Sequence, residues 1–316
     1  MRFGFWPNPR SSWPELVELS QHAERTGWDG IWYADHFMPA AADNSGPTNE
    51  SWAFLSALAA IIPRVRIGHL VCGNTYRHPA VVAKMAAGVD HVSGGRFVLG
   101  LGAGWQENEH RAYGIPLFEL GERMGRLDEA CHVIRGLLRE ERTTFPGKYY
   151  QLDGAICRPR PVQDPHIPFW IAGGGEQLTL NVAARYAAYT NFGISVDEFT
   201  HKSEVLRGHC DDVGRDFNDI VRTTNFFVVC EETEKDVEDR LGWIRNHYGK
   251  VVSEEQAERT LRLHRRMAGT PEQLVERLQP WVDAGATYSI LFFAEAGYDT
   301  SGMERFAREV IPAMSA

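Results

Sequence analysis

Several features that commonly identify a protein class are missing from this sequence. It has no hydrophobic run of membrane-spanning length, and no CxxC pair of cysteines. The N-terminus also lacks the apolar core and small-residue cleavage site of a secretory signal peptide. We therefore expect no metal site and no disulfide framework, but reduced thiols in a cytoplasmic protein. The scattered cysteines are Cys72, Cys131, Cys157, Cys210 and Cys230.

Basic charge is also scarce. The 316 residues include 33 Lys and Arg against 42 Asp and Glu, which gives a formal net charge of -9. An acidic chain without a long Lys/Arg block is a poor partner for nucleic acid or for an anionic membrane. Hydrophobic residues make up 43% of the chain, which is enough for a large core. We therefore expect a globular protein whose partner is a small molecule.

The sequence does contain a regular alternation of short apolar runs and amphipathic stretches. Eight such repeats predict a single (β/α)₈ barrel over residues 1–316 rather than an open sheet. The predicted strands are 3–6, 30–34, 65–72, 96–101, 167–172, 189–192, 220–229 and 288–293. The predicted helices are 13–25, 50–62, 80–92, 123–139, 178–188, 196–213, a helical region over 233–284, and 303–311. Segments of about 140–166 and 230–270 are interpreted as insertions that cover the active face or form a dimer contact.

An Asp-His pair follows the second predicted strand. A barrel enzyme carries its chemistry on the loops that follow its strands, and Asp35 and His36 stand on such a loop. An imidazole titrates near neutrality, so it can donate a hydrogen bond or move a proton. The alternative is that the pair forms structural hydrogen bonds that fix the loop.

Glycines mark the ends of the third and fourth predicted strands. Gly73 follows Cys72, and Gly100, Gly102 and Gly104 alternate along strand four. Alternate residues share one face of a strand, so these glycines form a strip without side chains. Glycine inside a strand costs stability, and the close approach of a ligand or of another backbone segment would compensate for it. A bulge at a barrel corner is the alternative. The spacing does not match GxGxxG, which argues against a dinucleotide-binding fold.

The most informative local signal is Gly173-Gly174-Gly175, between a predicted strand and a predicted helix. Bare backbone amides and the positive end of a helix dipole bind anions without a lysine. A P-loop is excluded because the Gly-Lys-Ser/Thr ending is missing. We predict a phosphate cradle here, and a plain strand-to-helix connection is the alternative.

These motifs together resemble the luciferase-like monooxygenase superfamily over nearly the whole chain, from Phe3 to Pro312. The resemblance is greatest to the branch of coenzyme F420-dependent oxidoreductases. The segments that carry it are Tyr76-Arg77-His78-Pro79, Ala83-Lys84, Val89-Asp90, Ser93-Gly94-Gly95-Arg96, Gly100 to Trp105, Gly121-Glu122-Arg123, Gly173 to Gly175, Ala183-Ala184-Arg185-Tyr186-Ala187, Gly269-Thr270-Pro271-Glu272 and Glu309-Val310-Ile311-Pro312.

The resemblance implies a bacterial luciferase-like TIM barrel with coenzyme F420, or alternatively FMN, over its mouth. It also implies a non-proline cis peptide at Val71-Cys72 or Cys72-Gly73. His36 would contact the ring or substrate or relay a proton, and Glu109 is a second catalytic candidate. The implied cofactor-binding residues are Asp35, His36, Val71, Cys72, Gly73, Asn74, Ala103, Gly104, Trp105, Ala172, Gly173, Gly174, Gly175 and Glu176.

Two positions depart from the F420-dependent sugar-phosphate dehydrogenases of this superfamily. Those enzymes carry an acid directly after the strand-four glycine, where this chain has Trp105. They also carry a tryptophan shortly after the strand-two histidine, where this chain has Met38-Pro39. Their catalytic acid and substrate pocket therefore do not carry over.

Three functions are compatible with these residues. The leading one is an oxidoreductase that passes a hydride between F420 and a small organic substrate. The alternatives are an FMN-dependent monooxygenase that uses O₂, and a flavin-binding homologue without catalytic activity. The resemblance also implies a homodimer.

Overall fold

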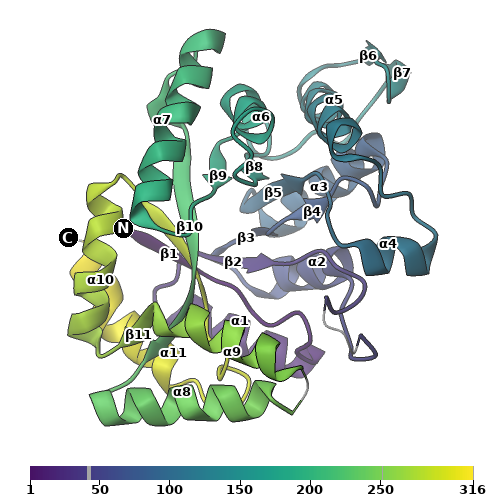
Figure 1. Cartoon of the computed structure of the whole chain (residues 1–316). Coiled ribbons are helices and arrows are strands. Elements are labelled where there is room, and N and C mark those ends of the chain that lie inside the picture. The colour runs from purple at the N-terminus through teal and green to yellow at the C-terminus, as the bar shows by residue number, and fades with distance from the viewer. Residues whose placement is uncertain (41–43, 251, 316) are drawn as a thin grey trace.

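The computed structural model describes residues 1–40, 44–250 and 252–315, which contain a closed parallel barrel (Figure 1). Neighbouring strands pair in parallel around the ring, and β12 closes it by pairing with β1. The predicted (β/α)₈ fold is confirmed. The barrel strands are β1 (Arg2–Phe5), β2 (Gly30–Tyr33), β3 (Arg66–His69), β5 (Phe97–Gly102), β8 (Phe169–Ala172), β9 (Tyr189–Asn191), β10 (Val221–Cys230) and β12 (Tyr288–Phe292).

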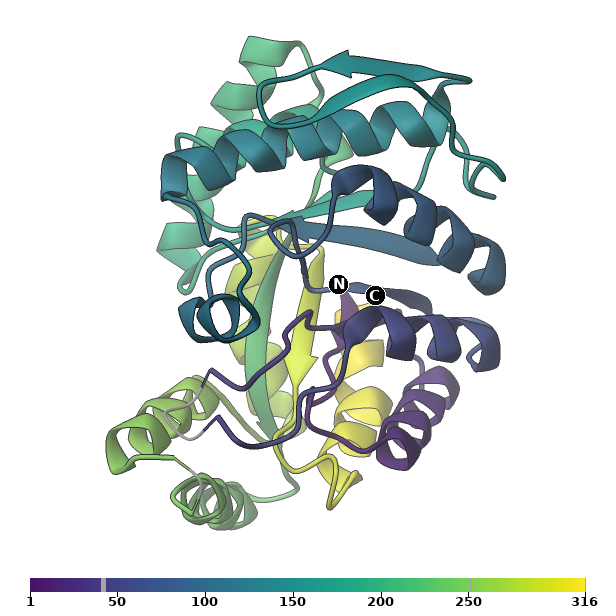
Figure 2. The ribbon, with the colours of Figure 1, turned by 90° about the vertical axis from the view of Figure 1, so that its right-hand side faces the viewer.

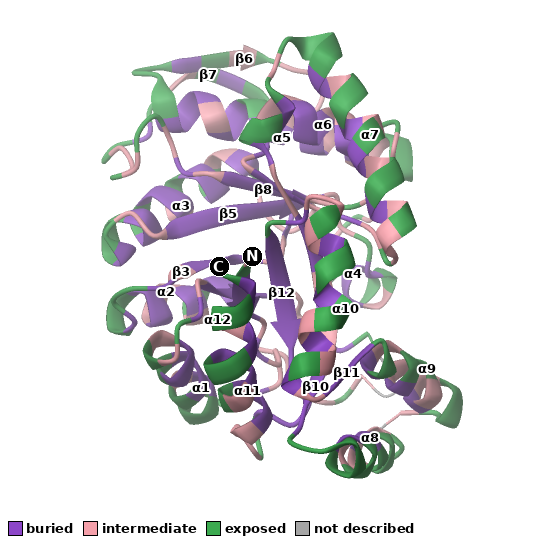
Figure 3. Ribbon diagram, turned by 90° about the vertical axis from the view of Figure 1, so that its left-hand side faces the viewer, coloured by how far each residue is buried: buried purple, intermediate pink, exposed green. Residues whose placement is uncertain are grey.

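Helices surround the barrel, with buried faces toward the strands and exposed faces outward (Figure 3). Outward strand residues such as Phe3, Phe5 and Phe97 form one apolar core with them. Within the described residues, none of the helices combines the length and apolar composition needed to cross a membrane. The surrounding helices are α1 (Trp13–Arg25), α2 (Ser51–Ile61), α3 (Pro79–Ser93), α5 (Leu120–Arg139), α6 (Thr179–Tyr186), α7 (Val196–Val213), α10 (Pro271–Asp283), α11 (Ser301–Arg305) and α12 (Ile311–Met314), with the 3₁₀ turn η1 (Phe217–Asp219) and the π-helical segment η2 (Phe306–Val310) between α11 and α12.

Aromatic side chains fill the inside of the barrel. Trp32, Trp170, Tyr189 and Tyr288 are buried there together, and Trp32 Nε1 donates a hydrogen bond of 2.9 Å to the Tyr288 hydroxyl. A Cβ on Gly4 would collide with the Trp32 indole, so this glycine makes room for it. The interior is therefore a packed core, and ligands can approach only at the barrel ends.

The structure contains some elements that the sequence did not predict. The predicted strand 65–72 divides into β3 and a separate β4 (Cys72–Gly73), which pairs with β5. Helix α4 (Glu107–Tyr113) follows β5. The predicted insertion 140–166 contains an antiparallel hairpin of β6 (Thr143–Pro146) and β7 (Gln151–Ala155), which lies over α5 (Figure 2).

The second predicted insertion lies beside the C-terminal ends of the strands. It consists of α8 (Glu234–Tyr248), α9 (Glu254–Arg265) and β11 (Met267–Gly269), which pairs with the end of β10. Val237 and Leu261 of these helices share an apolar cluster with Val229 and Phe292 from the ends of β10 and β12. The insertion therefore forms one wall of the barrel mouth.

Candidate active site

His36 stands at the mouth with a buried carboxylate behind it. Its Nδ1 lies 2.8 Å from Oε1 of Glu109, whose side chain is fully buried. The His36 side chain is 24% exposed, and within the described residues its Nε2 has no hydrogen-bond partner. The structure thus brings together the two residues predicted to be catalytic, with His36 on the accessible side.

Glu109 accepts hydrogen bonds from four donors. The backbone N–H groups of Phe37 and Met38 donate to Oε2 at 2.6 and 3.1 Å, and the Tyr76 hydroxyl shares Oε1 with His36. Burial alone would raise the pKa of Glu109, but the bonds from His36, Tyr76 and Phe37 hold it below its usual value. Because an ionised carboxylate only accepts, Nδ1 of His36 carries a hydrogen, and Nε2 of the neutral ring is an acceptor.

Asp35, the neighbour of His36, is buried and binds protein groups. Its carboxylate contacts Arg77 through both oxygens, at 2.7 and 3.2 Å, and it accepts from Ser51 Oγ at 2.7 Å and from the Gly73 N–H at 3.1 Å. Burial disfavours the charged form, but Arg77 and His69 outweigh it and lower the pKa of Asp35. Asp35 therefore fixes the loop after β2 to β4, which is the structural alternative that the sequence left open.

The glycine strip of β5 is covered by the connection between β3 and α3. A Cβ on Gly102 would lie 2.7 Å from a methyl carbon of Val71, and one on Gly104 would lie 2.6 Å from Oγ1 of Thr75. These two glycines thus make room for the side chains of Val71 and Thr75. Whether a ligand also approaches this strip stays a prediction.

That connection contains a non-proline cis peptide between Leu70 and Val71. The predicted positions, Val71-Cys72 and Cys72-Gly73, are wrong, because the bond lies at least one residue earlier. The reason is that the paired segment β4 begins at Cys72, so the irregular backbone falls between β3 and β4. Cys72 is fully buried, and burial raises the pKa of its thiol well above the usual value, which keeps it neutral.

The triple glycine forms an open turn between β8 and α6. Gly173 has φ +125°, a conformation that favours glycine, and its N–H donates to the Asn191 carbonyl at 3.2 Å. Within the described part of the chain, the N–H groups of Gly174 and Gly175 have no acceptor. A Cβ on Gly175 would lie 2.9 Å from Thr179 Oγ1. Two amides without an acceptor thus lie near the start of a helix, an arrangement that can bind an anion.

A lysine that the sequence did not indicate lies against this turn. A Cβ on Gly174 would be 2.6 Å from Nζ of Lys202, which comes from α7 and pairs with Glu198 at 2.7 Å. The Lys202 side chain is largely buried, so its charge is held close to the two free amides. The turn and the ammonium group together fit a phosphate.

Aromatic rings stand beside the polar groups of the mouth. Trp105 is 61% exposed, and its ring lies 5.5 Å from that of His36 in an edge-to-face arrangement. Trp6, Phe227 and Phe292 pack against one another at the ends of β1, β10 and β12. The mouth therefore offers apolar faces as well as hydrogen-bonding groups.

The remaining predicted residues lie on the same strand ends. Asn74 is 5% exposed, and its Nδ2 donates to the Tyr150 hydroxyl at 3.3 Å. Glu176 faces His201 at 3.2 Å. Ala103 and Ala172 are half-buried. Tyr150 reaches the site from the β6–β7 hairpin, a contact that the sequence did not indicate.

Sequence reasoning also missed the contribution of Tyr76 and Lys202. Tyr76 belongs to a motif that carried the family resemblance, but its hydrogen bond to Glu109 was not predicted. Lys202 has no local signal, because it lies within an ordinary amphipathic helix and meets the glycine turn only in the folded protein.

Comparisons with known proteins agree with this architecture. The family model of luciferase-like monooxygenases matches residues 1–288. An F420-dependent glucose-6-phosphate dehydrogenase of Amycolatopsis mediterranei (strain U-32) is 30% identical, over 96% of this chain and 95% of that protein.

Two solved structures show how widely the fold is shared. An F420-dependent secondary alcohol dehydrogenase in complex with an F420-acetone adduct aligns with a TM-score of 0.82 at 22% identity, over 99% of this chain and 98% of that one. A long-chain alkane monooxygenase aligns with a TM-score of 0.83 at 16% identity, over 100% of this chain and 91% of that one. At these identities the two structures establish the fold alone.

Proposed function

Because this chain belongs to the luciferase-like monooxygenase family, we propose that it is an oxidoreductase that uses coenzyme F420 to exchange a hydride with a small organic substrate. The observation that carries the proposal is that two groups of polar residues meet at the barrel mouth. One group is a histidine held on a buried carboxylate, and the other is a glycine turn beside Lys202. The full-length similarity to an F420-dependent dehydrogenase supports F420 over FMN.

The glycine turn would hold the cofactor phosphate. The N–H groups of Gly174 and Gly175 would donate to it, and Lys202 would supply the opposite charge. Val71 and Asn74, on the connection after β3, would support the ring. When bound, F420 supplies a carbon that accepts or gives up a hydride.

His36 would handle the proton. Its Nε2 has no donor among the residues that the structure describes, so it can take a proton from a substrate hydroxyl and return one in the reverse direction. The ionised Glu109 would stabilise the positive ring that forms when Nε2 is protonated. Glu109 would thus act as a positioning residue through His36, since its own oxygens are fully used by protein donors.

The aromatic mouth favours a substrate with an apolar body. Trp105 occupies the position where the family's sugar-phosphate dehydrogenases carry an acid, and its exposed ring can stack on a substrate. The half-buried rings of Trp6 and Phe227 add apolar surface near the neighbouring strand ends, and Phe292 packs against both. We therefore propose a small apolar alcohol or carbonyl compound rather than a sugar phosphate.

Titration of the purified apoprotein with F420 and with FMN tests the cofactor. We expect tight binding of F420 and weak binding of FMN, followed by fluorescence. Tight FMN binding without measurable F420 binding would instead support the monooxygenase alternative. A loaded protein that turns over none of a broad panel of alcohols, ketones and alkenes would support the homologue without activity.

Gly174→Val tests the cradle. Gly174 has no positive φ, and only the flexible end of Lys202 must move, so the variant should fold. We expect F420 affinity to fall by about tenfold or more, because the branched side chain blocks the amides. Gly208→Val on α7, where a Cβ meets nothing within 4 Å, is the matched control and should bind normally. Equal affinity in both variants would refute the cradle.

A further inference from the structure

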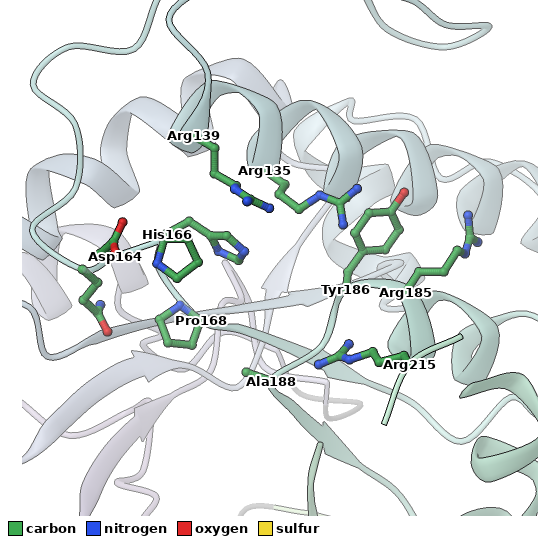
Figure 4. A pocket seen from close by; sticks show the side chains of 11 residues that line it. Arg135, Arg139, Asp164, His166, Pro168, Arg185, Tyr186, Ala188 and Arg215 are labelled. Carbon is green, nitrogen blue, oxygen red and sulfur yellow. The ribbon is translucent and has the colours of Figure 1, made fainter. Parts of the chain in front are cut away.

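A cavity opens at the end of the barrel opposite the mouth. It has a volume of about 430 Å³ and lies between the last turns of α5 and α6 and the segment that leads into β8 (Figure 4). Four arginines line it: Arg135, Arg139, Arg185 and Arg215. In a chain of net charge -9, this concentration of positive charge is a local exception.

Most of this charge is not neutralised by the protein. Arg185 pairs with Asp128 at 2.8 Å. Within the described residues, Arg135, Arg139 and Arg215 have no carboxylate within ion-pair distance. Asp164 is the one acidic side chain among the lining residues. The cavity therefore has an excess of unpaired guanidinium groups.

The arginines come from opposite sides of the cavity. Figure 4 shows Arg135 and Arg139 reaching in from α5, with Arg215 across from them and His166 between. Arg135 and Arg139 are one helical turn apart, a spacing at which like charges destabilise a helix unless an anion lies between them. Arg215 is fixed by the carbonyls of Ala184 and Ala187 at 3.2 and 2.5 Å, so its position does not depend on a ligand.

His166 also lines this cavity. Burial lowers its pKa, and Arg139, Arg135 and Arg215 lower it further, while its Nδ1 bonds the Ile167 carbonyl at 2.6 Å. The guanidinium groups therefore carry the positive charge of this cavity.

We propose that this cavity is a second ligand site, which binds a small anion that carries phosphate groups. Guanidinium groups are permanently charged, and their planar forks match phosphate oxygens in pairs. The volume suits a small ligand rather than a macromolecule. The site is separated from the mouth by the aromatic core of the barrel, so its occupant is not the cofactor phosphate held at Gly174.

Calorimetric titration of the full chain with inorganic diphosphate tests the proposal. Citrate, a carboxylate of comparable charge, is titrated at equal ionic strength. We expect the diphosphate binding of this cavity to persist in Gly174→Val, whose cradle at the mouth is blocked, and citrate to bind the cavity less tightly. The double variant R135Q/R139Q should bind diphosphate at least about tenfold more weakly, because two charge-assisted contacts are lost.

The double variant R25Q/R259Q is the matched control. It also removes two positive charges, from exposed arginines on α1 and α9, and it should bind diphosphate like wild type. Three results would overturn the proposal: equal losses in both double variants, loss of binding in Gly174→Val alone, or citrate binding as tight as that of diphosphate. Thermal unfolding of each variant without ligand confirms that a loss of binding is not a loss of fold.

Discussion

Replacement of Glu109 by glutamine should change which nitrogen of His36 carries its hydrogen. Each carboxylate oxygen of Glu109 accepts from two donors: Oε1 from His36 and Tyr76, and Oε2 from the backbone N–H groups of Phe37 and Met38. A glutamine has one oxygen and one NH₂ group. Because the backbone groups can only donate, the oxygen should face them and the NH₂ group should face His36. Nδ1 of His36 must then accept, and its hydrogen moves to Nε2 at the mouth.

The two consequences of Glu109→Gln have different sizes. The free energy of unfolding should fall by about 2 kcal/mol, because two charge-assisted bonds from Phe37 and Met38 become neutral ones. Turnover should fall by about 10² to 10⁴, since the nitrogen at the mouth becomes a donor and can no longer take a proton. The functional effect should therefore greatly exceed the loss of stability.

Three measurements follow this change. Nitrogen NMR of the imidazole ring reports the tautomer, urea unfolding reports stability, and the F420-dependent rate with the best substrate of the panel reports turnover. Glu107→Gln is the matched control, because Glu107 lies exposed on the same helix, α4. An unchanged His36 tautomer in Glu109→Gln, or turnover within threefold of the control, would refute the reasoning.

The stability difference between wild type and Glu109→Gln should also depend on pH. The folded-state pKa of Glu109 lies below its usual 4.5, so its stabilising contribution is present above pH 4.5. The contribution is lost as the pH falls through the folded-state value. A difference that stays constant down to pH 3 would contradict this assignment.

Further substitutions test other parts of the structure. Lys202→Gln should weaken F420 binding by about tenfold and leave the binding of a deazaflavin without the phosphate unchanged. Calorimetry with both ligands tests this, and equal losses of affinity for the two ligands would contradict the cradle. Arg77→Gln should lower the free energy of unfolding by about 3–5 kcal/mol, because it leaves Asp35 buried and unpaired, and a loss below 1 kcal/mol in urea unfolding would argue against this ion pair. Glu295 is buried without a partner for either oxygen within the described residues, and burial raises its pKa to about 7. Wild type should therefore lose stability as the pH rises from about 4.5 to about 7, and Glu295→Gln should be more stable than wild type at pH 8 by roughly 3 kcal/mol. If the free energies of unfolding of the two proteins changed in parallel with pH, this assignment would be refuted.

The barrel could be predicted from the sequence because its signals are local. Short apolar runs such as Phe97–Gly102 alternate with amphipathic stretches such as Val196–Val213, and the period of each is visible without any tertiary contact. The glycine turn was visible for the same reason, because three consecutive glycines before a helix leave the backbone amides uncovered and free to adopt unusual conformations.

The polar network of the mouth could not be predicted in the same way. Glu109 receives donors from the loop after β2 and from the connection after β3, which meet only when the barrel closes. Helix α4 was missed because it is a single short segment, although Gly114 marks its end in the sequence. The position of the cis peptide depends on where strand pairing stops and resumes, which local composition does not encode.

The exposed ring of Trp105 gives this protein an optical probe of its own active site. Of the nine tryptophans, Trp105 and Trp13 are exposed, whereas Trp28, Trp32 and Trp170 are fully buried. Trp13 lies on the outer helix α1, so a water-soluble quencher should reach it whether or not the mouth is filled. Trp105 touches His36 at the mouth, so a molecule that settles there should shield its indole from the same quencher. Occupancy of the site can thus be followed through intrinsic emission, without a label and before any substrate is known.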